Sequence, residues 1–387
     1  MLILISGALA NRPSNGGGAW VRLSWLRGFQ RLGCQVFFLE QIRRGSCVDA
    51  EGAPASFEKS ENLAYFRKVV AQFGLEGCAA LVCDDGSDSH GATIPDLEHI
   101  VQSADLLVNI TGHLTMPRLF QGARHKAYID IDPGFTQYWH ASGVSGAHLE
   151  GHDLYYTIGE NIGDAACPIP TGGIEWRPIR QPVVLDDWPV ADPASGFDRF
   201  TTIASWRGAF GPVDADGRRF GLKVHEFRKV IELPRRTGLD FEIALDIHPG
   251  DARDQESLVA HGWRVVDPRL AAGDPAGFRR YVQQSGAEFS VAQGIYVETN
   301  SGWFSDRTVR YLASGKPALV QDTGVSRCLP VGQGLMAFRT LDEVVEGARR
   351  IASDYEAHAV AARAIAERFF DSDTVLSRVL DDVKGTP

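Results

Sequence analysis

The sequence lacks the long apolar segments and leader features of membrane and exported proteins. No apolar run in its 387 residues approaches the roughly 20 residues that a transmembrane helix needs. The first residues, Met1 to Ser6, carry no basic segment and form too short an apolar stretch for a signal peptide. We therefore expect no membrane span, a cytoplasmic location and a first buried strand at this position.

Basic residues are also fewer than acidic residues. The chain has 39 Lys and Arg residues against 49 Asp and Glu residues, which gives a formal net charge of −10. Binding to the phosphate backbone of nucleic acids depends on cationic side chains. The composition therefore disfavours nucleic acid as a partner, and it carries no signal for an oligomeric state.

Patterns that bind metals or dinucleotides are missing as well. The six cysteines are scattered without the spacing of zinc ligands, and in the absence of an export signal we expect free thiols. His140, His148 and His152 resemble no closed zinc site. The dinucleotide fingerprint G-x-G-x-x-G does not occur, which weighs against a dehydrogenase. We expect neither a metal nor a resident cofactor.

What the sequence does contain is a regular alternation of strand-like and helix-like segments. Short apolar runs typical of buried strands lie, in the first half, at residues 2–7, 36–39, 79–83, 106–110, 128–131 and 154–158. Helical patterns separate several of these runs. The alternation predicts an α/β protein whose parallel sheet is covered by helices on both faces.

A Pro- and Trp-rich passage from Cys167 to Pro193 interrupts the alternation, and we predict that it is an interdomain linker. Strand-like runs then resume at residues 201–205, 241–245, 264–266, 289–292 and 318–320. Residues 341–383 are expected to be almost entirely helical. The chain is long enough for two domains with full hydrophobic cores.

The segment from Thr299 to Gly324 is the most informative part of the chain. A small polar loop, Asn300–Trp303, precedes a helix that Ser305 can cap, and a buried strand, Ala318–Val320, follows. A helix start exposes unpaired N–H groups and partial positive charge, so it can hold a diphosphate. Arg307 in the first turn would oppose the helix dipole unless an anion bound there. The alternative is an ordinary strand–loop–helix–strand connection.

This segment resembles the donor-binding signature of the nucleotide-sugar-dependent glycosyltransferases of the GT-B fold. The matching residues are Thr299-Asn300-Ser301-Gly302-Trp303-Phe304-Ser305, then a helix, then Gly315-Lys316-Pro317 and Asp322. Asn300 stands where the family has a phosphate-contacting histidine. Arg310 or Thr308, depending on how the helix is counted, stands where the family has a ribose-binding glutamate.

The resemblance implies a fold of two Rossmann-like, doubly wound parallel-sheet domains that face a cleft. Residues 1–180 would form the acceptor domain and residues 195–370 the donor domain. A C-terminal helix at 371–387 would cross back and pack on the first domain. The donor would be a nucleotide sugar linked to UDP or dTDP.

The resemblance also implies donor contacts. Arg207 and Lys223 would neutralise the diphosphate, and the insertion 208–221 between them would be a lid or a rigid turn. The glycine triplet 16–18 at a helix start indicates close approach of the backbone to a ligand, or else a flexible loop. The other predicted diphosphate contacts are Gly17, Gly18, Asn300, Ser301, Gly302, Trp303, Ser305, Asp306 and Arg307. The predicted sugar contacts are Gln321 and Asp322.

Catalytic candidates follow two strands of the first half. Ligands of doubly wound sheets lie at the carboxyl ends of the strands, which is where His113, Asp130 and Asp132 are expected. Two neighbouring carboxylates raise the pKa of one of them and make it a better base. We therefore predict Asp132 or His113 as the acceptor base, with Asp130 as the neighbouring carboxylate. The alternatives are a loop histidine and a turn-forming aspartate.

Together these features predict a metal-independent glycosyltransferase that moves a sugar from a nucleoside diphosphate donor to a small-molecule acceptor. A nucleotide-sugar 2-epimerase of the same fold is one alternative. A two-lobed binding protein without catalysis is another. Inversion or retention at the reacting carbon stays open.

Overall fold

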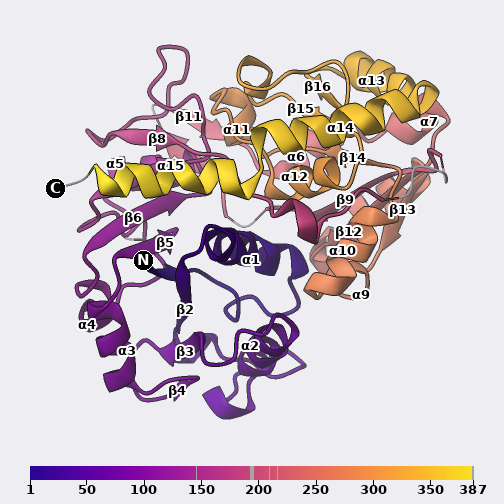
Figure 1. The fold of residues 1–387 in the computed structure, drawn as a ribbon. Helices are drawn as coiled ribbons and strands as arrows, with labels where there is room; N and C mark the ends of the chain where they lie inside the picture. The colour runs from indigo at the N-terminus through magenta and orange to yellow at the C-terminus, as the bar shows by residue number, and fades with distance from the viewer. Residues whose placement is uncertain (145, 192–195, 209, 216, 386–387) are drawn as a thin grey trace.

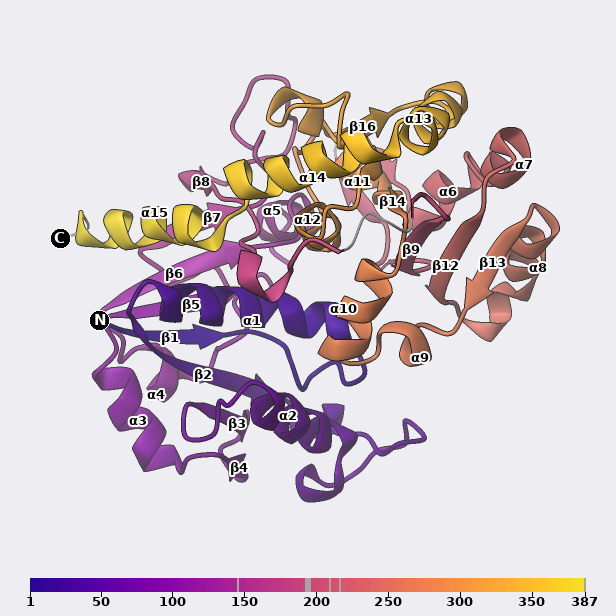
Figure 2. The ribbon, with the colours of Figure 1, turned by 45° about the vertical axis from the view of Figure 1, so that its right-hand side comes forward.

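The computed structural model describes residues 1–144, 146–191, 196–208, 210–215 and 217–385. The domain boundary predicted at residue 195 and the last two residues lie outside this description. Each half of the chain builds one sheet, and the helices α14 (Tyr355–Phe369) and α15 (Ser372–Lys384) run from the second sheet to the first (Figures 1 and 2).

The first sheet has eight strands in the order β4-β3-β2-β1-β5-β6-β7-β8. Neighbouring strands are parallel except for β4, which is antiparallel to β3. The bounds are β1 Leu2–Ser6, β2 Gln35–Ile42, β3 Ala79–Cys83, β4 Ser89–His90, β5 Leu106–Ile110, β6 His125–Asp130, β7 Leu154–Thr157 and β8 Trp176–Pro178. Every residue of β3 and β5 is buried, as expected for parallel strands covered on both faces.

Five helices belong to the first sheet. They are α1 Gly16–Arg31, α2 Glu61–Gln72, α3 Ile94–Gln102, α4 Pro117–Phe120 and α5 Phe135–Ala141. The Asn15 side chain caps α1 by accepting a hydrogen bond from the Gly18 amide at 2.8 Å. Gly33 follows the helix with φ +78°, a left-handed conformation that ends helices and favours glycine.

The second sheet has six parallel strands in the order β13-β12-β9-β14-β15-β16. The bounds are β9 Phe200–Ser205, β12 Phe241–Asp246, β13 Trp263–Val266, β14 Ala287–Ser290, β15 Ala318–Gln321 and β16 Leu335–Phe338. Its helices are α6 Lys223–Arg228, α7 Leu233–Thr237, α8 Ala252–Ala260, α9 Pro268–Ala272, α10 Pro275–Gln283, α11 Gly294–Glu298, α12 Asp306–Ala313 and α13 Leu341–Ser353.

Both sheets are doubly wound. In the first, the chain passes from β1 outwards to β2 and β3 and then returns to the other side of β1 with β5. In the second, it passes from β9 to β12 and β13 and returns with β14. The strand order therefore reverses between β1 and β5 and between β9 and β14, and the carboxyl ends at these two points are where ligands bind in such sheets.

The insertion before α6 forms a hairpin that reaches the first half. Its strands β10 (Val213–Ala215) and β11 (Arg218–Phe220) are antiparallel. The ring of Phe210 lies 5.0 Å from that of Phe135 in α5, and Phe220 lies 5.6 Å from Tyr138. The segment predicted as a lid or rigid turn is thus a hairpin docked on α5 through aromatic rings.

The interpretation of residues 167–193 as a linker is wrong in part. Residues Trp176–Pro178 form β8, which pairs with β7 at the edge of the first sheet. The chain crosses to the second half only after this strand. Val183 forms an isolated bridge with Asp371, so the outward and returning crossings lie side by side.

The predicted return of the C-terminal helix is confirmed. A Cβ atom on Gly28 of α1 would lie 2.5 Å from Leu376 of α15, so glycine permits the close packing of these helices. Arg31 and Asp373 form an ion pair across the same contact at 3.1 Å. The six cysteines are free, as predicted. None of the described helices combines the length and apolar composition that crossing a bilayer requires.

Candidate functional site

The carboxyl edges of the two sheets meet around Asp132 and Tyr296. The Tyr296 hydroxyl of α11 donates a hydrogen bond to Asp132 Oδ1, which follows β6, at 3.4 Å. Nearby, the side-chain amide of Asn161 donates to the Asn300 carbonyl at 2.8 Å. The carboxyl edges of the two sheets are therefore in direct contact at this place.

Asp132 has the electrostatic surroundings of a base. Burial, together with the neighbouring Asp130 carboxylate, raises the pKa of Asp132 to about 6, while the positive charges of Arg12 and Arg22 oppose this rise. A carboxylate with a pKa about one unit below neutrality is deprotonated at pH 7 and still basic enough to accept a proton. Asp132 therefore meets the electrostatic requirement for the acceptor base, and its role stays a prediction.

His113 also lies at this edge, held by a strained turn. Thr111, directly after β5, has φ +59°, which is rare for a β-branched residue, and Gly112 follows with φ +61°. His113 Nε2 is buried without a hydrogen-bond partner in the described part of the chain and lies 3.9 Å from a Glu40 carboxylate oxygen. Burial, with Arg22 as the next cause, lowers the pKa of His113 to about 4. His113 is therefore neutral at pH 7 and a weaker base than Asp132.

Asp130 is hydrogen-bonded within the protein, so its place in the catalytic set is that of a neighbouring carboxylate and stays a prediction. Its fully buried carboxylate accepts hydrogen bonds from Thr136, Gln137, Thr157 and the Asp132 amide at 2.7 to 3.0 Å. The prediction placed both carboxylates on one side of the strand, so that the charge of Asp130 would raise the pKa of Asp132, and Asp130 does act on Asp132 in this direction. Because the strand ends at Asp130, that side chain turns into the protein and fixes the loop that carries Asp132.

Glu40 is a site residue that the sequence did not reveal. Its fully buried carboxylate, near the end of β2, accepts hydrogen bonds from the amides of the loop after β1, those of Leu9, Ala10 and Asn11, at 2.7 to 2.9 Å. Burial raises the pKa of Glu40 to about 7 despite these bonds. Glu40 thus shapes the loop that presents Arg12 to the site.

Arg22 of α1 is the second residue that was missed. Its Nε is buried without a partner among the described residues, and its Nη1 donates only to the Gly18 carbonyl at 3.2 Å. Burial lowers the pKa of Arg22 to about 10, and the charges of Glu40, Arg12, Asp306 and Asp132 act on it as well. The sequence carries no signal for it, since an arginine on an amphipathic helix usually faces solvent.

Lys223 lies where the sequence predicted a diphosphate contact. It begins α6, and its ammonium group forms no ion pair or hydrogen bond within the described ranges. Burial, then the positive charge of Arg307, lowers the pKa of Lys223 to about 8, while Glu288 and Asp306 act in the opposite direction. An unpaired ammonium in a partly buried position is costly unless an anion joins it.

Arg207 is at the carboxyl end of β9, but its guanidinium is already engaged. It makes a two-pronged ion pair with Asp251 at 2.6 and 2.8 Å, and its side chain is 59% exposed. It could still offer its remaining N–H groups to a diphosphate, so its role stays a prediction.

The start of α12 is free of side-chain caps. Ser305 occupies the cap position but accepts no hydrogen bond from the helix, contrary to the expected capping. The amides of Asp306, Arg307 and Thr308 have no acceptor among the described residues. Only the backbone amide of Asp306 is suited to contact a phosphate, because its carboxylate, which pairs with the buried Arg310 at 3.2 Å, would repel the phosphate.

Arg307 does not face the helix start, which corrects the inference drawn from its position. Its buried guanidinium donates to Glu288 at 2.6 Å, to the Ile203 carbonyl at 2.7 Å and to Ser290 at 2.8 Å. The requirement for a cation in the first turn therefore comes from a buried carboxylate in β14 and not from a bound anion.

The loop Asn300–Trp303 is also mostly occupied by contacts within the protein. The amides of Ser301 and Gly302 donate to Tyr296 and Thr323 carbonyls, and the Trp303 amide donates to the Ser301 hydroxyl. Below it, a cavity of about 10 Å³ is lined by Ser290, Ala292, Trp303, Phe304, Ser305, Thr308, Val320, Gln321 and Val325. This cavity has room for about one water molecule. The amides of Ser301 and Gly302 are thus already engaged, and contacts of Asn300, Ser301 and Gly302 with a diphosphate stay predictions.

The glycine triplet has a structural explanation. A Cβ atom on Gly16 would lie 2.3 Å from the Asp274 carbonyl oxygen, and one on Gly17 would lie 2.8 Å from the Phe278 ring. The Gly18 amide is used by the Asn15 cap. The close approach that the triplet permits is therefore to the start of α10 and not to a diphosphate, which corrects the assignments of Gly17 and Gly18.

The two predicted sugar contacts are engaged in the second half. The Gln321 side chain donates a hydrogen bond to the Glu226 carboxylate and accepts one from the Ala292 amide. The Asp322 carboxylate accepts from Gly324, Ser326 and Arg339. Both side chains are more than 90% buried, so these assignments are not supported by the structure. Within the described residues, no three His, Cys, Asp or Glu side chains gather as metal ligands would.

Comparisons with known proteins agree on the fold. No protein-family model and no curated protein matches the sequence. An alpha-glucosyltransferase solved with UDP is 10% identical, with 99% of this chain and 100% of that chain covered and a TM-score of 0.63. HepE from Anabaena, solved with UDP and glucose, is 12% identical over 100% of both chains with a TM-score of 0.60. Sucrose-phosphate synthase from Thermosynechococcus elongatus is 10% identical over 100% of both chains with a TM-score of 0.55.

At these identities the likeness establishes the fold. The predicted architecture, two facing Rossmann-like domains of the GT-B type with a returning C-terminal helix, is confirmed. An alpha-glucosyltransferase has also been solved with UDP and a 13-mer DNA, so this fold accommodates a macromolecule as well as a nucleotide.

Proposed function

We propose that the chain transfers a sugar from a nucleoside diphosphate donor, UDP- or dTDP-linked, to the hydroxyl of a small-molecule acceptor without a metal. One observation carries the proposal. Arg12, Arg22 and Lys223 form no ion pair among the described residues. The charges of Arg12 and Arg22 oppose the rise in the pKa of Asp132, and the Asp306 carboxylate at the uncapped start of α12 opposes the lowering of the pKa of Arg22 and Lys223. The fold and the UDP-containing neighbours support the choice of a nucleotide donor.

The proposed step moves one proton and breaks one bond. The acceptor hydroxyl oxygen bonds to the sugar carbon, its proton passes to the Asp132 carboxylate, and the bond between that carbon and the diphosphate oxygen breaks. Negative charge then grows on the leaving diphosphate. Arg12, Arg22, Lys223 and the free amides of α12 would stabilise that charge, which is the largest contribution such a site can make.

A small acceptor is preferred to DNA because the chain carries a formal net charge of −10. Release of free nucleotide only when an acceptor is supplied would separate transfer from 2-epimerisation. If the chain consumed no nucleotide sugar at all, the remaining hypothesis would be a two-lobed binding protein without catalysis.

The proposal predicts that UDP binding depends on cations of both halves. Lys223→Gln and Arg22→Gln should each weaken UDP binding by roughly 10–100-fold, since each removes a charge-assisted hydrogen bond. Isothermal titration with UDP and with dTDP measures this. Lys59→Gln, at an exposed lysine that is not among the site residues, is the matched control and should leave the affinity unchanged. Absence of binding to either nucleotide would overturn the proposal.

The pH dependence of kcat/KM should distinguish the two candidate bases. With Asp132 as the base, activity rises about tenfold per pH unit up to about pH 6, because only the deprotonated carboxylate accepts a proton. With His113 the rise would end near pH 4. A decline is expected above about pH 8 as Lys223 loses its charge. Lys223→Arg should remove the decline, because arginine stays protonated.

A further inference from the structure

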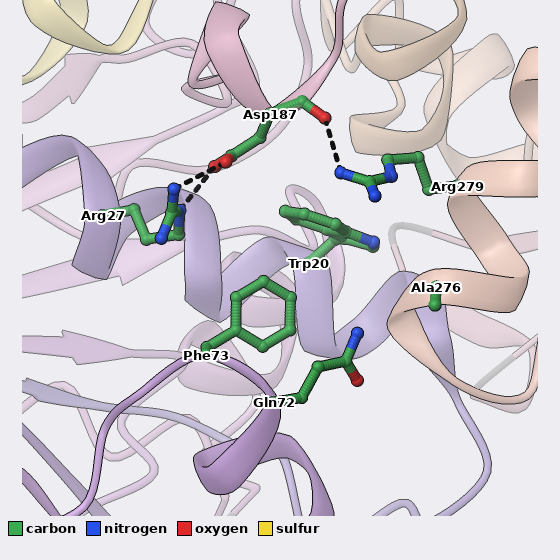
Figure 3. Close-up of a pocket in the computed structure, with 7 residues that line it drawn as sticks. All are labelled: Trp20, Arg27, Gln72, Phe73, Asp187, Ala276 and Arg279. Carbon is green, nitrogen blue, oxygen red and sulfur yellow. Dashed lines mark hydrogen bonds and ion pairs between the residues drawn. The ribbon is translucent and has the colours of Figure 1, made fainter.

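A cavity of about 270 Å³ lies outside the candidate site, where α1, the end of α2, α10 and the crossing segment meet (Figure 3). It contains Trp20 and Arg27 of α1, seven residues apart and therefore on one face of that helix. Arg22, two residues from Trp20, points to the opposite face and into the candidate site. The cavity and the site thus lie on opposite sides of one helix.

The cavity carries one surplus positive charge. Arg27 is neutralised by Asp187, with which it forms two hydrogen bonds at 2.6 and 2.7 Å. Arg279 of α10 donates only to the backbone carbonyl of Asp187, at 3.3 Å, and forms no ion pair among the described residues. Figure 3 shows both guanidinium groups beside Asp187. The charged groups of the cavity sum to one positive charge, which favours a ligand with a single negative charge.

The other wall is aromatic and rigid. Trp20 Nε1 donates to the Pro275 carbonyl at 2.8 Å, which fixes the indole. The Phe73 ring meets Trp20 edge-on with 5.3 Å between centroids, and Arg27 lies 6.0 Å above Phe73. The side-chain amide of Gln72 adds a neutral polar group. A volume of about 270 Å³ is just below the usual range for small-molecule sites, so it suits a ligand of about one ring.

We propose that this cavity binds a small aromatic monocarboxylate, with the carboxylate on Arg279 and the ring against the partly exposed Phe73, which the buried Trp20 holds in place. The planar fork of a guanidinium matches a carboxylate, and aromatic edges favour an aromatic ring. The walls come from both halves of the chain and from the crossing between them. An occupied cavity therefore holds α1 and α10 at a fixed separation.

The test is isothermal titration of the full chain with three probes. Benzoate has both the ring and the charge, benzamide has the ring without the charge, and acetate has the charge without the ring. Benzoate should bind with a stoichiometry of one and at least about tenfold more tightly than either of the others, since a charged hydrogen bond is worth that much. Equal affinity for benzoate and benzamide would overturn the proposal.

Two variants locate the binding. Arg279→Gln should bring benzoate affinity down to that of benzamide, and Ala276→Leu should block the ring without changing the charges. Arg280→Gln, at the exposed neighbouring arginine, is the control and should bind benzoate as the original chain does. Unchanged benzoate affinity in Arg279→Gln would contradict the assignment. Titration of UDP on the same samples is independent, so a chain that binds benzoate but not UDP would remove only the proposed sugar transfer.

Discussion

Asp132→Asn is expected to lower kcat by about 10²–10⁴-fold, the usual contribution of a positioned general base. Asparagine keeps the shape of the side chain and can still accept the Tyr296 hydrogen bond, but it cannot take the acceptor proton. UDP affinity should fall little or rise, because the substitution removes a negative charge beside Arg12 and Arg22. Initial rates of nucleotide release at saturating donor, with titration of UDP, give both quantities.

Asp130→Asn is the matched control for this experiment. It changes the neighbouring aspartate, whose carboxylate is fully buried and hydrogen-bonded within the protein. Its main effect should be a lower melting temperature, whereas Asp132→Asn should melt close to the original chain. A loss of less than threefold in kcat for Asp132→Asn would show that another group accepts the proton.

Arg307→Gln is expected to destabilise the fold by about 3–5 kcal/mol, because it leaves the Glu288 carboxylate buried without its cation. Glu288 is fully buried and the Arg307 side chain is 12% exposed, so water replaces little of the lost interaction. Arg307 also holds the Ile203 carbonyl and Ser290, which ties α12 to β9 and β14. Unfolding in urea, followed by circular dichroism, measures the loss.

The double variant Glu288→Gln with Arg307→Gln tests the cause. Removing both charges should recover a large part of the stability, since two neutral amides need no counter-charge in the interior. If the double variant is as unstable as the single one, the loss comes from the contacts to Ile203 and Ser290 instead. A loss below about 1 kcal/mol in the single variant would contradict the buried ion pair altogether.

Most of the fold could be predicted from the sequence because buried parallel strands appear as uninterrupted apolar runs. The runs at 79–83 and 106–110 coincide with β3 and β5. The strand β8 was not predicted, because it has only three residues, lies at a sheet edge and ends in proline. It therefore has neither the length nor the composition of a core strand. Hairpin docking was unpredictable, since aromatic residues in a loop do not show what they will contact.

The site was predictable only where topology determines it. His113 and Asp132 follow strands, so the rule for strand ends located them. Arg22 depends on the direction of one helix face relative to the other half, which a single sequence does not contain. Arg307 was misread although a signal existed: Glu288 lies within the buried strand β14 and requires a cation nearby.

The doubled crossing between the halves limits how this protein can be recombined. Because α15 packs on α1 while the chain before it belongs to the second sheet, the first half is not a continuous stretch of sequence. A chimaera that joins this first sheet to a donor half from another protein must therefore keep both Val183 and the segment from Asp371 onward. Two splice points, placed opposite each other on the paired crossings, are needed where one would be expected.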